Sequence, residues 1–100
     1  MSEHDVVAGQ KLFIEKVGGR AYLINQSRGK THSFTTPGIA DMLVFVDGHC
    51  FWNEVKDGAN KPEPAQLAFC DQVTQTGGLY VVTRSVDDLM DVCKDLGIWR

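Results

Sequence analysis

Three charged residues have the types and the spacing that a divalent-metal site requires. Asp41 opens one apolar stretch, and Glu54 and Lys56 lie near the end of the next. Carboxylate oxygens are preferred ligands of Mg²⁺ and Mn²⁺. A bound cation would also offset the repulsion between two neighbouring carboxylates, which otherwise forces one of them to take up a proton. Such a site requires that the two stretches bring these side chains together.

A predicted hairpin places Asp41 opposite Glu54. The dipeptide Asp47-Gly48 is a strong turn signal, and a two-residue turn fixes which residues pair, although a bulged turn of odd length would break the pairing. The two Cβ atoms would then lie roughly 4.5–5.5 Å apart. Lys56 lies two residues further along and projects from the same face. The neighbouring positions are apolar, so these charges interrupt a predicted core face; the alternative is a plain surface ion-pair cluster.

The strands belong to a predicted domain with the element order α-β-β-β-α-β-α. Apolar residues at helical spacing, β-branched residues in short runs, and Gly, Pro or Ser at segment ends define the elements. Helices are expected over about 4–17, from the Pro62-Pro64 region to about 76, and between Ser85 and Gly97; strands are expected over 21–24, 41–46, 50–56 and 79–83. Residues 25–38 form an expected long loop, a feature that is usually functional.

Both faces of the central hairpin are apolar. One face carries Leu43, Phe45 and Trp52, and the other carries Met42, Val44 and Phe51. A sheet that is apolar on both faces needs helices on both sides. The sequence therefore predicts an α/β domain with a mixed central sheet flanked by helices.

Composition narrows the class of protein. A length of 100 residues with 43% hydrophobic residues suits a single domain over 1–100, and no stretch approaches the ~18 apolar residues of a membrane span. The polar, acidic start is unlike a signal peptide, which favours the cytoplasm. Cys50, Cys70 and Cys93 are widely spaced in apolar runs, so we interpret them as core residues rather than as a disulfide framework or a zinc site.

The hairpin and its flanks resemble a known nuclease signature. Pro37-Gly38-Ile39-Ala40-Asp41, a hydrophobic strand and then Phe51-Trp52-Asn53-Glu54-Val55-Lys56 resemble the PD-(D/E)xK motif. The order G-x-x-D, hairpin, E-V-K, P-x-x-x-Q, Gly-Gly and a V-V-x-R-S strand exit is similar to the VRR-NUC domain, over about residues 3–96. One departure is Ala40, which stands where the family usually has Pro.

The resemblance implies a restriction-endonuclease-like core and metal-dependent hydrolysis of phosphodiester bonds. It assigns Mg²⁺ or Mn²⁺ as the cofactor, with Asp41, Glu54, the carbonyl of Val55 and the first-helix residue Glu3 as ligands. Lys56 would position or activate the attacking water, and Gln66 in the following helix completes the catalytic set. The family also implies DNA as the partner, with stand-alone members resembling homodimers that cut branched DNA such as four-way junctions.

The net charge of −3 is unfavourable for a protein that binds DNA through Lys and Arg alone, but it is compatible with carboxylates that hold cations, which then meet phosphate. Arg28, Lys30 and His32 are candidate phosphate contacts, with simple solvation as the alternative. Tyr22, Phe34 and Tyr80 could stack on bases, although aromatic residues in short strands more often belong to the core. The tail Ile98-Trp99-Arg100 could pack across a subunit boundary or fold back on its own domain.

Two other functions stay open at this point. A domain with this fold could be catalytically inactive and serve only to bind nucleic acid or a protein. A sequence-specific, restriction-type nuclease is a third possibility, although 100 residues leave little room for elements that read bases.

Overall fold

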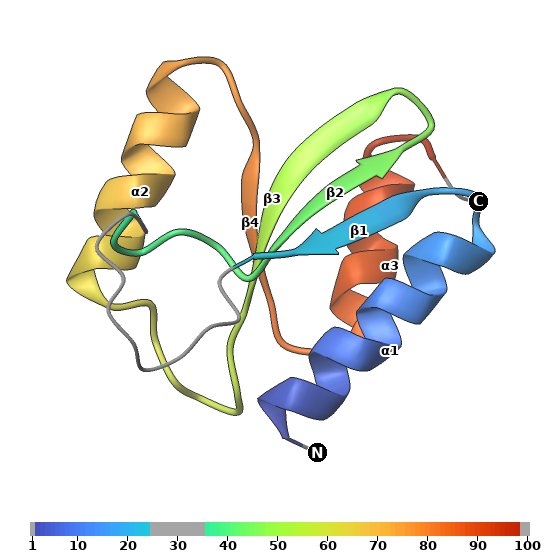
Figure 1. The fold of residues 1–100 in the computed structure, drawn as a ribbon, viewed down its shortest axis with the longest axis horizontal. Helices are drawn as coiled ribbons and strands as arrows, with labels where there is room; N and C mark the ends of the chain where they lie inside the picture. The colour runs from blue at the N-terminus through green and yellow to red at the C-terminus, as the bar shows by residue number, and fades with distance from the viewer. Residues whose placement is uncertain (1, 25–35, 99–100) are drawn as a thin grey trace.

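A computed structural model describes residues 2–24 and 36–98 of the chain, and within these ranges four strands form one sheet that carries three helices (Figure 1). The elements are α1 (Glu3–Lys16), β1 (Arg20–Leu23), β2 (Met42–Val46), β3 (His49–Val55), α2 (Pro64–Gln75), β4 (Tyr80–Thr83) and α3 (Val86–Asp95). The predicted order α-β-β-β-α-β-α is confirmed. No helix in the described ranges is long and apolar enough to cross a bilayer.

The sheet is mixed, as predicted, and its strands follow the order β1-β2-β3-β4. β1, β2 and β3 pair antiparallel, whereas β4 returns through α2 and pairs parallel with β3. Asp47 and Gly48 have φ angles of 49° and 81°, the left-handed conformation that tight two-residue hairpin turns need. This turn pairs Val46 with His49 and confirms the predicted hairpin register.

Helices lie on both sides of the sheet. α1 and α3 pack together against one side and α2 lies alone on the other (Figure 1). The larger apolar cluster lies beneath α1 and α3, and it contains Val6, Ile14, Ala21, Met42, Val44, Val46, Phe51, Val55, Leu89 and Cys93. A smaller cluster lies beneath α2, where Ala40, Phe69 and Val73 pack against Ile39, Trp52 and Tyr80. Alternation along β3 therefore sends Trp52 and Glu54 toward the α2 side.

The α2 side of the sheet is covered only in part. α2 lies over β3 and β4, so the outer side chains of β1 and β2 face solvent: Tyr22 is 54% exposed and Phe45 is 44% exposed. Their rings meet edge to face, with centroids 5.9 Å apart. The interpretation of Cys50 as a core residue is wrong, because Cys50 pairs with Phe45 and is exposed on the same open face. The expectation that Tyr22 belongs to the core is wrong for the same reason.

Gly38 holds the chain before β2 close to the start of α2. Its φ angle is +76°, and a Cβ at this position would lie 2.1 Å from the carbonyl oxygen of Ala65 and 2.7 Å from the backbone nitrogen of Gln66. Only a residue without a side chain allows this approach. Gly38 therefore fixes the distance between the segment that leads into Asp41 and the helix that carries Gln66.

Replacing Gly38 with Ala is expected to lower the free energy of unfolding by about 3 kcal/mol or more, because the new Cβ would collide with the backbone of α2. The control is Gly58→Ala, where φ is +52° but an added Cβ would meet nothing within 4 Å. That change should cost only the left-handed conformation, about 1–2 kcal/mol. Chemical denaturation measures both, and equal losses would contradict the close approach to α2.

Candidate active site

The ends of β2 and β3 bring the two predicted carboxylates together. Asp41 directly precedes β2, and the pairing of Met42 with Asn53, continued by one residue, places Asp41 opposite Glu54. Asp41 Oδ2 accepts a hydrogen bond of 2.7 Å from the backbone N–H of Val55. This bond joins the two strand ends and aims the Asp41 carboxylate at the end of β3.

Glu54 is buried, with only 3% of its surface exposed. Its Oε2 accepts a hydrogen bond of 2.6 Å from Nε2 of Gln66 and lies 3.7 Å from Nζ of Lys56. Its Oε1 is also buried, and no group in the described ranges satisfies it. A buried acceptor without a partner is costly. A bound cation or a proton would remove this cost.

Burial and charge act together on the two carboxyl groups. Burial raises the pKa of Glu54 to about 7; the charge of Asp41 adds to this rise, and Lys56 opposes it. Burial also raises the pKa of Asp41, against the hydrogen bond from Val55 and the charge of Lys56. The pair therefore resists carrying two full negative charges near neutral pH. A divalent cation between them would let both ionise.

Lys56 lies where the sequence predicted it, on the same side as Glu54. Its side chain is largely buried, and its backbone N–H donates to the carbonyl of Thr83 at 3.0 Å, which prolongs the pairing with β4 by one residue. The backbone therefore holds the ammonium group beside the carboxylates. At 3.7 Å from Glu54 it remains close enough to stabilise negative charge there.

Gln66 links the start of α2 to this cluster. Its Oε1 accepts from the backbone N–H of Glu63 at 2.8 Å, and its Nε2 donates to Glu54 at 2.6 Å. Gln66 therefore makes a helix-end contact and a contact to the site at the same time. A hollow of about 380 Å³ opens here, lined by Thr36, Pro37, Gly38, Ile39, Asp41, Glu54, Glu63, Ala65 and Gln66.

Glu3 lies at the edge of the cluster rather than inside it. It lies in the first turn of α1 and is mostly exposed. The burial that remains raises the pKa of its carboxyl group; the charge of Asp41 adds to this rise, and the charge of Lys56 opposes it. Across residues 2–24 and 36–98, no three His, Cys, Asp or Glu side chains gather closely enough to hold one ion. The role of Glu3 as a direct ligand, like that of the Val55 carbonyl, therefore stays a prediction.

The donor set nevertheless fits a hard cation. Asp41 and Glu54 could supply carboxylate oxygens from two strand ends, and Oε1 of Glu54, which has no hydrogen-bond partner among the described residues, could serve as a ligand. Mg²⁺ is usually bound by one or two carboxylates together with water and substrate phosphate. Two carboxylates are thus enough to begin such a site.

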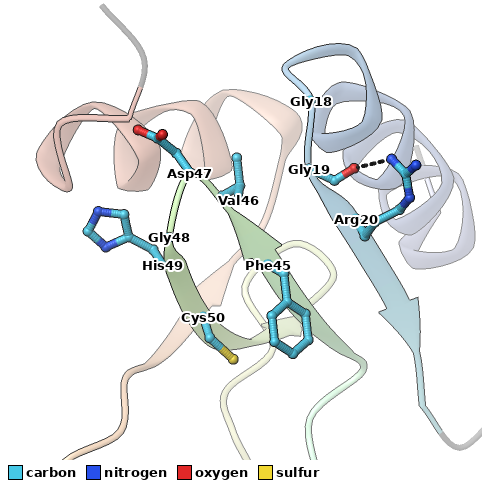
Figure 2. A pocket seen from close by; sticks show the side chains of 9 residues that line it. All are labelled: Gly18, Gly19, Arg20, Phe45, Val46, Asp47, Gly48, His49 and Cys50. Carbon is cyan, nitrogen blue, oxygen red and sulfur yellow. Dashed lines mark hydrogen bonds between the residues drawn. The ribbon is translucent and has the colours of Figure 1, made fainter.

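A second hollow, of about 590 Å³, lies at the opposite end of the hairpin (Figure 2). Its walls are the Gly18-Gly19-Arg20 turn and the 45–50 segment, and Arg20 donates to the carbonyl of Gly19 at 2.9 Å. Asp47 is the only carboxylate among the residues that line it. The groups that could bind a metal and act on phosphate lie at the other end, beside Glu54.

Several sequence predictions concern residues outside the described ranges. Arg28, Lys30 and His32 fall there, as do Phe34 and Trp99, so their roles stay predictions. Arg84 entered the sequence analysis only as part of the V-V-x-R-S strand exit, without a role. Its Nη1 donates to the carbonyls of Gly58 and Asn60 at 2.8 and 2.7 Å. These two bonds hold the loop that follows Lys56.

Comparison with known proteins places this geometry in context. No family model and no curated protein matches the sequence. Among solved structures, the chain is similar to one described as a VRR_NUC domain, with a TM-score of 0.70 and 29% sequence identity. The match covers 89% of this chain and 94% of that one.

The raised pKa of Glu54 predicts how the stability of the metal-free protein depends on pH. Because folding favours protonated Glu54, stability in EDTA should fall as pH rises from about 4.5 to 7. Glu54→Gln removes this loss, so at pH 8 the variant should be more stable than the wild type by up to about 3 kcal/mol, and the gain should shrink toward pH 5. Denaturation in EDTA across this range measures the difference.

The matched control is Asp71→Asn, which changes an exposed carboxylate on α2. Its stability profile should run parallel to that of the wild type. A Glu54→Gln profile that also ran parallel to the wild type would contradict the electrostatic strain at the site.

Proposed function

We propose that this chain, which is a VRR-NUC domain and so has a nuclease-type fold, is a Mg²⁺- or Mn²⁺-dependent endonuclease that hydrolyses phosphodiester bonds of DNA. The observation that carries the proposal is the buried Glu54, held opposite Asp41 with one oxygen unsatisfied and Lys56 beside it. Buried, mutually repelling carboxylates of this kind are characteristic of functional sites that bind a cation. The similarity to a nuclease domain supports phosphodiester hydrolysis as the reaction in which the cation would take part.

Each residue of the cluster has a distinct part in the proposed reaction. Asp41, Glu54 and the Val55 carbonyl would hold the ion, which when bound neutralises phosphate charge and lowers the pKa of water. Gln66 keeps Oε2 of Glu54 engaged and so leaves Oε1 as the oxygen for the ion. The ammonium group of Lys56 is placed to orient the attacking water and to stabilise charge that develops on the phosphate.

A catalytically inactive DNA-binding domain is the second candidate. It is favoured by the absence of a third carboxylate close enough to share an ion within the described ranges. The two candidates differ in one simple property. An inactive domain would bind DNA equally well in EDTA and in Mg²⁺, whereas the proposed nuclease needs the cation to bring phosphate up to two carboxylates.

We also propose that two copies act together on branched DNA. Coordinated cleavage of two strands needs two sites in a fixed relation, which a twofold dimer supplies. The open face of the sheet offers apolar surface to a second copy: Tyr22 and Phe45 are exposed on it, and Figure 2 shows Phe45 and Cys50 on the hairpin beside β1. Among the described residues β1 is also an edge strand of the sheet, and an edge strand can pair with another chain.

Asp41→Asn and Glu54→Gln are expected to abolish cleavage in Mg²⁺ and Mn²⁺, because each removes a carboxylate charge from the ion. Lys56→Ala should reduce turnover more than Mn²⁺ affinity, since a protonated lysine has no lone pair for a metal. Labelled duplex, flap and four-way-junction DNA, incubated with either metal or with EDTA, measure cleavage, and calorimetry measures Mn²⁺ binding. Glu15→Gln, on the exposed side of α1, is the control. Wild-type cleavage by a folded Asp41 or Glu54 variant would refute these roles.

Light scattering at micromolar concentration should give twice the chain mass of 11.1 kDa. Phe45→Lys should convert the protein to the monomer, because a charge on the open face opposes burial against a second copy. Leu12→Lys changes an even more exposed apolar residue, on α1, and should leave the mass unchanged. A wild-type mass near that of one chain would refute the dimer. Equal rates on a four-way junction and on plain duplex would refute the preference for branched DNA.

A further inference from the structure

A closed ring of polar side chains lies inside the larger apolar cluster. Nε2 of Gln10 donates to Oγ1 of Thr83 at 2.8 Å, Oγ1 of Thr83 donates to Oδ1 of Asn53 at 2.8 Å, and Nδ2 of Asn53 donates to Oε1 of Gln10 at 2.8 Å. All three residues are completely buried. Each side chain donates one bond and accepts one, so the three bonds polarise each other around the ring.

The ring joins four elements at one point. Gln10 belongs to α1, Asn53 to β3 and Thr83 to β4, and a second hydrogen of Gln10 Nε2 reaches the carbonyl of Ser85, the N-cap of α3, at 2.9 Å. Apolar side chains could fill this space without this requirement, whereas a buried polar group destabilises the fold unless each of its hydrogen-bond partners is present. The ring instead gives specificity. Because hydrogen bonds require a particular length and direction, they are all formed in only one arrangement of these elements.

This point lies directly behind the candidate active site. Asn53 immediately precedes Glu54 on β3, with its side chain on the opposite side of the sheet. Thr83 pairs with Val55, and its carbonyl accepts from the backbone N–H of Lys56 at 3.0 Å. The ring thus fixes the backbone of the segment that carries Glu54, Val55 and Lys56.

We propose that Gln10, acting through Asn53 and Thr83, is a positioning residue for the nuclease reaction: the ring holds the Glu54–Lys56 segment in the position that metal binding and turnover require. The proposal rests on the proposed function. Its alternative is that the ring only stabilises the fold. The two differ in whether breaking the ring changes metal affinity and turnover beyond what an equal loss of stability does.

Position 83 offers the sharpest test. Thr83→Val keeps the shape of the side chain but removes the hydroxyl, leaving Gln10 without one acceptor and Asn53 without its donor. Thr83→Ser keeps the hydroxyl and removes only a methyl group. If the ring positions the site, Thr83→Val should lose about tenfold or more in Mn²⁺ affinity and in kcat, with KM for DNA unchanged, while Thr83→Ser stays near the wild type. Gln10→Met should repeat the effect of Thr83→Val.

Val46→Ala is the control for stability, because it removes core volume at the far end of the hairpin. It should lower the melting temperature without changing Mn²⁺ affinity or kcat. A folded Thr83→Val protein with wild-type affinity and kcat would overturn the proposal, and so would equal losses in Thr83→Ser and Thr83→Val, which would assign the effect to packing.

Hydrogen exchange in EDTA separates a failure of this proposal from a failure of the proposed function. Faster exchange of the Val55 and Lys56 amides in Thr83→Val, but not in Thr83→Ser, is expected whether or not the protein cleaves DNA. A wild-type protein that neither binds Mn²⁺ nor cleaves DNA would overturn the nuclease function and the catalytic role of the ring together. If hydrogen exchange of the Val55 and Lys56 amides is unchanged in Thr83→Val, the ring does not fix the Glu54–Lys56 segment and the proposal is wrong.

Discussion

Two carboxylates held on opposite strands at the end of a hairpin are the constraint around which the rest of the structure is arranged. Asp41 is tied to Val55 by a bond of 2.7 Å, so it cannot turn away from Glu54 without losing a hydrogen bond. Glu54 is only 3% exposed, and its Oε2 is held by Gln66 of α2. The repulsion between the two groups is therefore built into the fold, and a divalent cation held by both would relieve it.

Uncharged contacts on both sides of the sheet keep the two carboxylates in place. Gly38 lets the segment before Asp41 lie against α2, which in turn places Gln66 on Glu54. On the opposite side of the sheet, the buried ring of Gln10, Asn53 and Thr83 fixes the backbone of β3. Charged side chains at a strand end would otherwise rotate apart, so the uncharged contacts around them determine whether the cluster keeps its geometry.

Much of this arrangement could be predicted from the sequence, because the deciding signals were local. The Asp47-Gly48 turn fixed the register, and the register alone paired position 41 with position 54. The extent to which each face is covered could not be predicted, because it depends on where α2 lies: Phe45 and Cys50 have apolar strand patterns, yet they face solvent. The polar ring could not be predicted from the sequence either, because Gln10 and Asn53 are 43 residues apart and meet only in the folded chain.

The position of Glu3 shows a different limit. A helical pattern places it on the inward side of α1, but its distance from the carboxylates depends on how the whole helix packs, which no local pattern encodes. The structure puts it within electrostatic reach of Asp41 but outside any cluster of three potential ligands in the described ranges.

Anomalous scattering from Mn²⁺, in a crystal of the wild-type protein grown without nucleic acid, tests the two-carboxylate metal site directly. One strong peak is expected between the side chains of Asp41 and Glu54, with Oε1 of Glu54 as a ligand. A well-ordered site without such a peak at saturating Mn²⁺, with Glu54 still bonded only to Gln66, would contradict the two-carboxylate metal site.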